Sequence, residues 1–258
     1  MKCCCKIPPQ SAALQSYTLH SHSPIKESVS LLGYEKWALS ELALKYHHKC
    51  SHVKSRFTQS SFTTLEVEIA GNTIFVRRYG KSPAILLVHG FPRTSLMWRF
   101  LAPKLAENHT VICVDLRAYG RSGIPASTDD HVPYSKRAMA KELVDVMAKL
   151  GFPTFMVIGH DRGGRVSYRM ALDHPKNVER LAVLDVIPIV EAWSRCDTRF
   201  AQTYWPWILL SQKQPLPENY LLGAPEAVFQ NPFGQGSFDQ EILDEYVSTF
   251  RDPARVHG

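Results

Sequence analysis

The residues with the clearest chemical potential lie at 159–165, Gly-His-Asp-Arg-Gly-Gly-Arg. An apolar run at 155–159 leads into this segment and a helical pattern follows it, so the segment predicts a sharp turn from a strand into a helix. Glycines flank Asp161 at the spacing of a nucleophile elbow. The start of a helix favours an anion, and a carboxylate can displace a leaving group from carbon to form an ester. Asp161 is therefore a candidate nucleophile.

Asp161 has a structural alternative, because an aspartate at this place can simply cap the N-terminus of a helix. A second motif favours the chemical interpretation. His-Gly-Phe-Pro at 89–92 follows another short apolar run, at 84–88. We predict that the backbone N–H groups of Phe91 and Arg162 are the two donors of an oxyanion hole.

An ester on Asp161 needs a general base to activate water for its hydrolysis, and histidine is the usual choice. Asp185 ends the apolar run at 181–186, a position from which a carboxylate can orient a histidine, although a structural role is also open. His257 is the one histidine that follows Asp185 in the sequence. His160 adjoins Asp161, but we expect its side chain to point away from the reacting face. Because neither histidine is expected to act as the general base, the sequence predicts slow hydrolysis of the ester and slow turnover.

The elements that must hold these residues follow a regular alternation. Residues 63–70 and 73–78 predict a β-hairpin around Gly71-Asn72. Buried strands are expected at 84–88, 111–116, 155–159 and 181–186, and helices at 94–106, 135–150 and 165–172. This order predicts an α/β fold with a doubly wound, mostly parallel sheet.

The chain divides unevenly in charge and composition. It has 258 residues, with 30 Lys and Arg against 24 Asp and Glu, a formal net charge of +6. Residues 1–60 hold eight of the basic and three of the acidic residues, which leaves 22 against 21 in the remainder. We therefore expect no nucleic-acid partner, since a basic stripe on the folded part is missing. No apolar run is long enough to span a membrane.

The same division predicts three segments. Residues 1–61 are expected to be an extension, largely disordered, with one possible helix at 28–49. Residues 62–188 are expected to form the α/β core and residues 189–258 an incomplete helical cap. We expect a cytoplasmic protein, with organelle targeting by the extension as the alternative. The sequence leaves the oligomeric state open.

Together the motifs at 89–92, 115–122, 159–165 and 251–257 resemble those of the haloacetate (fluoroacetate) dehalogenases. An aspartate-centred elbow is also typical of the related epoxide hydrolases. The resemblance runs from about residue 62 to the end of the chain. It implies an α/β-hydrolase fold whose cap is partial and whose C-terminal strands are missing.

The resemblance also implies roles for individual residues. Asp161 would attack the substrate, and Arg162 and Arg165 would hold its carboxylate, as paired guanidinium groups do well. Arg165 could instead belong to a structural ion pair. Trp207 would donate its indole N–H to the departing halide, whereas Pro206 stands where the family has a histidine and can donate nothing.

Three functions remain open at this point. The first is a dehalogenase-type hydrolase acting on a small, carboxylate-bearing substrate. The second is an epoxide hydrolase, for which Tyr204 and Tyr220 are candidate proton donors. The third is an inactive, truncated fragment or binding protein that lacks the base histidine. None of the three calls for a metal or an organic cofactor.

Overall fold

The structure is a computed structural model that describes residues 62–81, 83–230 and 238–257. The expected extension at 1–61 and its possible helix lie outside the described residues. The strands that it describes form one sheet of six, in the order β1-β2-β4-β3-β5-β6. The predicted α/β fold class is confirmed.

One edge of the sheet is the predicted hairpin. Strand β1 (Thr63–Ile69) pairs antiparallel with β2 (Asn72–Tyr79). Between them Ala70 and Gly71 both have positive φ, 49° and 81°. A two-residue turn of this kind matches the twist of the two strands. It lies one residue before the predicted Gly71-Asn72, because Asn72 begins β2 and pairs with Ile69.

The remaining strands alternate with helices as predicted. Strands β3 (Ala84–Val88), β4 (Thr110–Val114), β5 (Phe155–His160) and β6 (Val178–Leu184) are parallel to their neighbours in this group. Every residue of β3 and β4 is buried. A strand covered by helices on both faces must be apolar throughout, and this explains the short continuous apolar runs.

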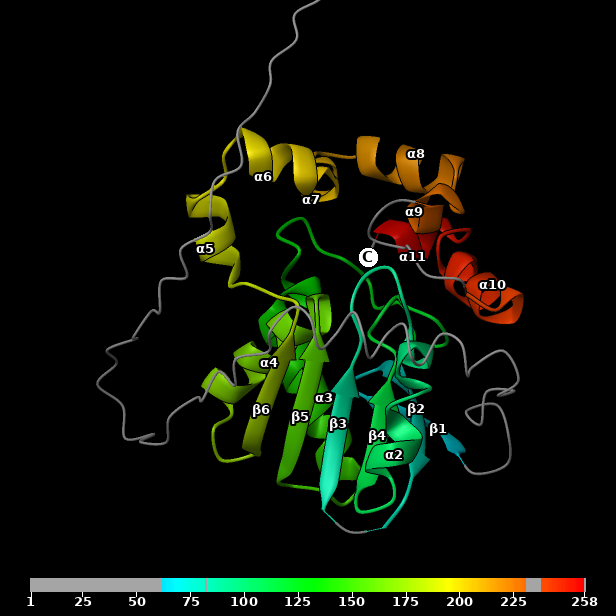
Figure 1. Ribbon diagram of the computed structural model, residues 1–258, viewed down its shortest axis with the longest axis vertical. Helices are drawn as coiled ribbons and strands as arrows, with labels where there is room; N and C mark the ends of the chain where they lie inside the picture. The colour runs from blue at the N-terminus through cyan, green and yellow to red at the C-terminus, as the bar shows by residue number, and fades with distance from the viewer. Residues whose placement is uncertain (1–61, 82, 231–237, 258) are drawn as a thin grey trace, which may run out of the picture. The chain divides into compact units, whose positions relative to one another are not determined.

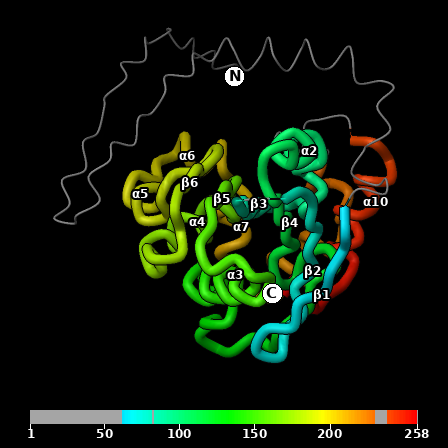
Figure 2. The backbone as a smooth tube through the Cα atoms, turned by 90° about the horizontal axis from the view of Figure 1, so that it is seen from below, coloured from blue at the N-terminus to red at the C-terminus, as the bar shows by residue number. Residues whose placement is uncertain are grey.

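Helices cover both faces of the sheet. Helices α3 (Lys136–Lys149) and α4 (Arg162–Asp173) lie on one face, and the short α2 (Ala102–Leu105) lies on the other (Figure 2). Helix α3 begins at Ser135, whose side chain accepts a hydrogen bond from the backbone N–H of Ala138. Apolar side chains of α3 form the inner face that the sequence pattern indicated.

The predicted helix at 94–106 is wrong as a single element. A 3₁₀ turn covers Ser95–Trp98, and α2 begins only at Ala102. Pro103 explains the interruption, because proline lacks an N–H and clashes with the preceding turn of a helix. It is tolerated at the second position of α2, where that hydrogen bond would be missing in any case.

After β6 the described secondary-structure elements are all helices. The short helices are α5 (Ile189–Ser194), α6 (Thr198–Thr203), α7 (Trp205–Leu210), α8 (Leu216–Gly223), α9 (Ala227–Gln230), α10 (Gln240–Thr249) and α11 (Pro253–His257). Helices α5 to α8 lie across the carboxyl ends of the parallel strands (Figure 1). The division of this unit into a core at 62–188 and a cap at 189–258 stays a prediction.

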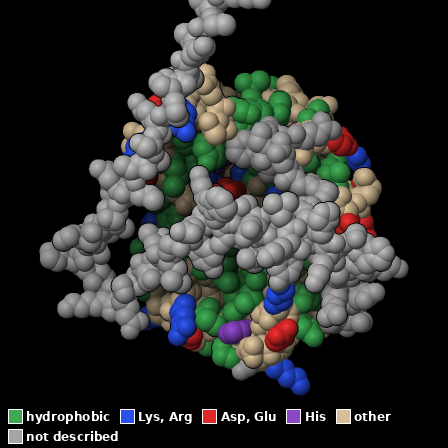
Figure 3. Space-filling model, in the orientation of Figure 1, with side chains coloured by type: hydrophobic (Ala, Val, Ile, Leu, Met, Phe, Trp, Pro, Cys, Tyr) green, Lys and Arg blue, Asp and Glu red, His purple; other side chains and the backbone are tan. Residues whose placement is uncertain are grey.

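The face seen in Figure 3 has a hollow between the cap and the strand ends, with acidic and basic side chains visible inside and hydrophobic ones around it. Across the described residues, no helix combines the length and the hydropathy that crossing a bilayer requires. The carboxyl ends of β3, β5 and β6 face this hollow, so the predicted site residues can meet there.

Candidate active site

Asp161 lies at the tightest point of the chain between β5 and α4. Its backbone has φ 47° and ψ −115°, a conformation that residues other than glycine rarely adopt. Such strain is typical of functional sites, where the surrounding structure imposes it. The predicted elbow is therefore present, with the side chain of Asp161 at the N-terminus of a twelve-residue helix.

Two glycines make this turn possible by their lack of a side chain. A Cβ atom on Gly90 would lie 2.5 Å from the Cβ of Asp161. A Cβ atom on Gly163 would overlap the backbone carbonyl oxygen of Val88. The elbow thus packs directly against the end of β3, which brings the loop at 89–92 to Asp161.

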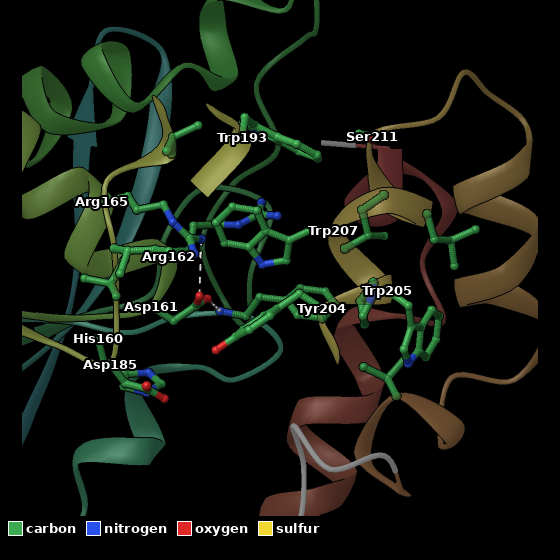
Figure 4. A pocket seen from close by; sticks show the side chains of 18 of the residues that line it. His160, Asp161, Arg162, Arg165, Asp185, Trp193, Tyr204, Trp205, Trp207 and Ser211 are labelled. Carbon is green, nitrogen blue, oxygen red and sulfur yellow. Dashed lines mark hydrogen bonds and ion pairs between the residues drawn. The ribbon is translucent and has the colours of Figure 1, made fainter. Parts of the chain in front are cut away.

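The carboxylate of Asp161 does not cap α4, so the structural alternative from the sequence does not describe it. Instead its Oδ1 accepts a hydrogen bond of 3.1 Å from the backbone N–H of Phe91. Its Oδ2 lies 3.2 Å from Nη1 of Arg165, one helical turn along α4. Both contacts fix the orientation of the carboxylate at the cavity, and Figure 4 draws the ion pair with Arg165 as a dashed line.

The loop that carries Phe91 is itself fixed by a buried histidine. The backbone N–H of Leu116 donates to Nε2 of His89 at 2.9 Å, which leaves Nδ1 to donate to the carbonyl oxygen of Gly90 at 3.1 Å. Burial lowers the pKa of His89, so the ring stays neutral. His89 is therefore a structural residue, and the N–H of Phe91 is well positioned. The second predicted donor, the N–H of Arg162, stays a prediction.

Arg165 lies between Asp161 and the cap. Its guanidinium carbon is 4.0 Å from the ring centre of Trp207, a cation–π contact in addition to its ion pair. Burial lowers the pKa of Arg165, against the opposing effect of the Asp161 charge. The family resemblance implied that the indole N–H of Trp207 holds the halide; the stacking of Trp207 on Arg165 is a contact that it did not indicate.

Two further cations belong to this site. Arg162 lies near the rings of Tyr119 and Phe91, at 5.6 and 5.9 Å. Lys136, the first residue of α3, also lines the cavity and was missed in the sequence. Burial, and then the charges of Arg162 and Arg165, lower the pKa of Lys136 to about 7. Lys136 belongs to no recognisable motif. It lies at the cavity because α3 packs against α4.

Asp185 follows β6 as predicted and lies at the rim of the cavity, where its side chain is 90% exposed. Its Oδ2 is 4.0 Å from Nε2 of His160, too far for a hydrogen bond. These two side chains lie together and away from the carboxylate of Asp161 (Figure 4). His257 lies in α11, where its Nδ1 is 3.1 Å from Glu218. Among the described histidines, only His160 lines the cavity.

The cavity above Asp161 has a volume of about 660 Å³. Its floor comes from the ends of β3, β5 and β6, and its roof comes from the cap. Most of the side chains that form the roof are aromatic, and Pro206 lies among them. The aromatic residues are Trp193, Phe200, Tyr204, Trp205, Trp207 and Tyr220. The site therefore joins a cluster of charges at the floor to an apolar chamber.

The described part of the chain contains no group of three or more His, Cys, Asp or Glu side chains that could hold a metal ion. The groups that the described residues bring to the cavity are a carboxylate, cations and a backbone N–H donor.

A mostly parallel sheet with a strained strand-to-helix elbow at the end of a central strand is typical of the α/β hydrolases. Residues 83–218 match the family described as "alpha/beta hydrolase fold". The chain belongs to this family.

Proteins of similar sequence include a dehalogenase and an epoxide hydrolase. A fluoroacetate dehalogenase from Burkholderia sp. is 45% identical over 198 residues, 74% of this chain and 65% of that protein. A soluble epoxide hydrolase from Corynebacterium sp. (strain C12) is 41% identical over 109 residues, 42% of this chain and 36% of that protein. The chain thus spans less than two thirds of the length of these relatives.

Solved structures agree in fold. A provisionally assigned epoxide hydrolase from Pseudomonas aeruginosa superposes with a TM-score of 0.71 at 37% identity, over 78% of this chain and 69% of that one. A provisionally assigned α/β hydrolase from Nostoc sp. PCC 7120 gives 0.73 at 41% identity, over 76% and 69%. The resemblance to the dehalogenase and epoxide hydrolase branch is confirmed.

Proposed function

We propose that this chain is a dehalogenase-type hydrolase in which Asp161 is the nucleophile and the substrate is small and bears a carboxylate. An oxygen of Asp161 attacks the carbon that bears the halogen. A carbon–oxygen bond forms, the carbon–halogen bond breaks, and the halide leaves with the bonding electrons. The product on the protein is an ester of Asp161.

The observation that carries this proposal is the position of the Asp161 carboxylate between the N–H of Phe91 and the guanidinium of Arg165. Both contacts fix the orientation of the two carboxylate oxygens beside the cavity. Arg162 and Arg165 supply positive charge for a substrate anion, and hydrogen bonds to charged groups contribute ~1.5–3 kcal/mol each. That is enough to orient a small ligand for in-line attack.

Hydrolysis of the ester needs a water molecule and a base. Water adds to the ester carbonyl, the base takes its proton, and the Asp161 carboxylate is released with the hydroxylated product. In the described residues the one histidine of the cavity, His160, faces away from the carboxylate of Asp161 (Figure 4). Loss of general-base assistance costs ~10²–10⁴-fold in rate, so we expect ester formation to outpace its breakdown.

Epoxide opening is the second candidate, since Tyr204 and Tyr220 both line the cavity and a phenol can protonate an epoxide oxygen. The test measures the intact mass of the chain after incubation with chloroacetate or with styrene oxide. A carboxymethyl adduct that D161N does not form supports the dehalogenase reaction. An adduct with the epoxide alone assigns the second reaction, and no adduct or product with either contradicts both.

A further inference from the structure

The cations of the cavity differ in the partners that they have. Arg165 is held by Asp161 at 3.2 Å and by the ring of Trp207. Arg162 lies over two aromatic rings. Among the described residues, neither Arg162 nor Lys136 forms an ion pair with a carboxylate, and Lys136 has no hydrogen bond from its ammonium group. Two cationic side chains therefore line the cavity without a direct ion-pair partner, and Asp161 is the carboxylate whose charge acts on Lys136.

The position of Lys136 is fixed by two rigid elements. It is the first residue of α3, directly after the N-cap Ser135, and α3 packs along α4, which begins at Arg162. Its side chain lines the same cavity as those of Asp161, Arg162 and Arg165, and the charges of these three residues act on it. A partly buried ammonium group is unfavourable without an anion, so an anion that binds beside Lys136 stabilises its charged form.

We propose that Lys136 is a third anion-binding residue of this cavity, which holds the carboxylate of the ligand together with Arg162 while Arg165 stays on Asp161. The identification of this ligand as the substrate rests on the proposed function. The ligand class is an organic carboxylate. The aromatic roof adds apolar contact to the part of the ligand that extends away from the floor.

One consequence is that binding takes up a proton. In the free protein the pKa of Lys136 is about 7. The groups that act on it are Arg162 and Arg165, which lower its pKa, and Asp161, which raises it. A bound carboxylate raises it further, because it favours the charged amine. Affinity is then greatest below pH 7 and falls by about tenfold for each pH unit above it, until the pKa of the complex is reached.

The test uses the full chain and phenylacetate, which has no leaving group and so cannot alkylate Asp161. Phenylacetamide is its uncharged counterpart. Titrations at pH 6.5, 7.5 and 8.5 follow the tryptophan fluorescence of the cavity. We expect the Kd of phenylacetate to rise steeply across this series and that of phenylacetamide to stay constant. Burial lowers the pKa of His160 from its ordinary value of 6.5, so His160 titrates below this window.

Two variants and a control make the assignment specific. K136Q is expected to weaken phenylacetate binding at pH 6.5 by about tenfold or more and to abolish its pH dependence. K136R keeps the charge, so it is expected to bind well at every pH of the series. K141Q is the control, because Lys141 lies on the same helix but is exposed and pairs with Asp145; it should behave as wild type.

The proposal is overturned if phenylacetate binds wild type with the same Kd at pH 6.5 and 8.5, or if K136Q binds as wild type does. Neither measurement depends on ester formation. Normal alkylation of Asp161 with a pH-independent Kd would reject the Lys136 assignment alone. The expected pH dependence without alkylation would reject the proposed function alone.

Discussion

Arg165 Nη1 lies 3.2 Å from Oδ2 of Asp161, and the same guanidinium is stacked on Trp207 at 4.0 Å. One side chain thus connects the elbow to the cap. The position of the Asp161 carboxylate and that of Trp207 in α7 are therefore linked through Arg165.

Replacing Arg165 tests this link. We expect R165M to slow carboxymethylation of Asp161 by about 10–100-fold, because a charge-assisted contact of ~1.5–3 kcal/mol is lost. The matched control is R169M: Arg169 pairs with Asp173 on the same helix at the same spacing but lies outside the cavity. Equal rates for R165M and R169M in a time course by mass spectrometry would contradict the role of Arg165.

Trp207 distinguishes two roles for the roof. If its ring supports Arg165, W207F keeps most of the reaction rate and W207L loses up to about 30-fold, since a desolvated cation–π contact contributes up to ~2 kcal/mol. If its indole N–H holds the departing halide, phenylalanine and leucine are equally poor. Chloride release measured for both variants decides between them, and we expect W207F to be the more active.

Gly163 sets the shape of the elbow. We expect G163A to lower the free energy of unfolding by ~1–3 kcal/mol, as overpacking does, because the new Cβ meets the carbonyl oxygen of Val88. G223A is the control: no atom lies within 4 Å of a Cβ there, so its stability should be unchanged or slightly higher. Urea unfolding of both variants gives the comparison; a stable G163A would show that the elbow adapts.

The lowered pKa of Lys136 also predicts how the free energy of unfolding varies with pH. Its pKa falls from 10.5 to about 7 on folding, so between these values the unfolded chain binds the additional proton. Stability from this group therefore rises with pH between about 7 and 10.5, and its unfavourable contribution is complete below pH 7. We expect K136Q to be more stable than wild type at pH 6, with the difference shrinking by pH 9.5. Urea unfolding at both values checks this, and a difference that grows with pH would contradict it.

The fold could be predicted well because its strongest signals are local. The run at 84–88 coincides with β3, and Ser135 caps the helix that its pattern indicated. The one clear error came from the same kind of signal: apolar spacing at 94–106 continued past Pro103, and the proline decided the structure.

The site could be predicted only where its residues share a motif. Asp161, Arg162 and Arg165 lie on one turn, and the loop of Phe91 follows a recognisable strand. Lys136 could not be found, since its approach depends on how α3 packs on α4. The same holds for the stacking of Trp207, which depends on where the cap lies over the sheet.

The most direct test of the account is to locate the covalent product. Wild-type chain treated with chloroacetate is digested, and its peptides are sequenced by mass spectrometry. The account predicts one carboxymethyl group on Asp161, removable by hydroxylamine as an ester, with one chloride released per group formed. D161N should carry none. An unmodified Asp161 in wild type that releases chloride, or equal labelling of D161N, would contradict the assignment of Asp161 as the nucleophile.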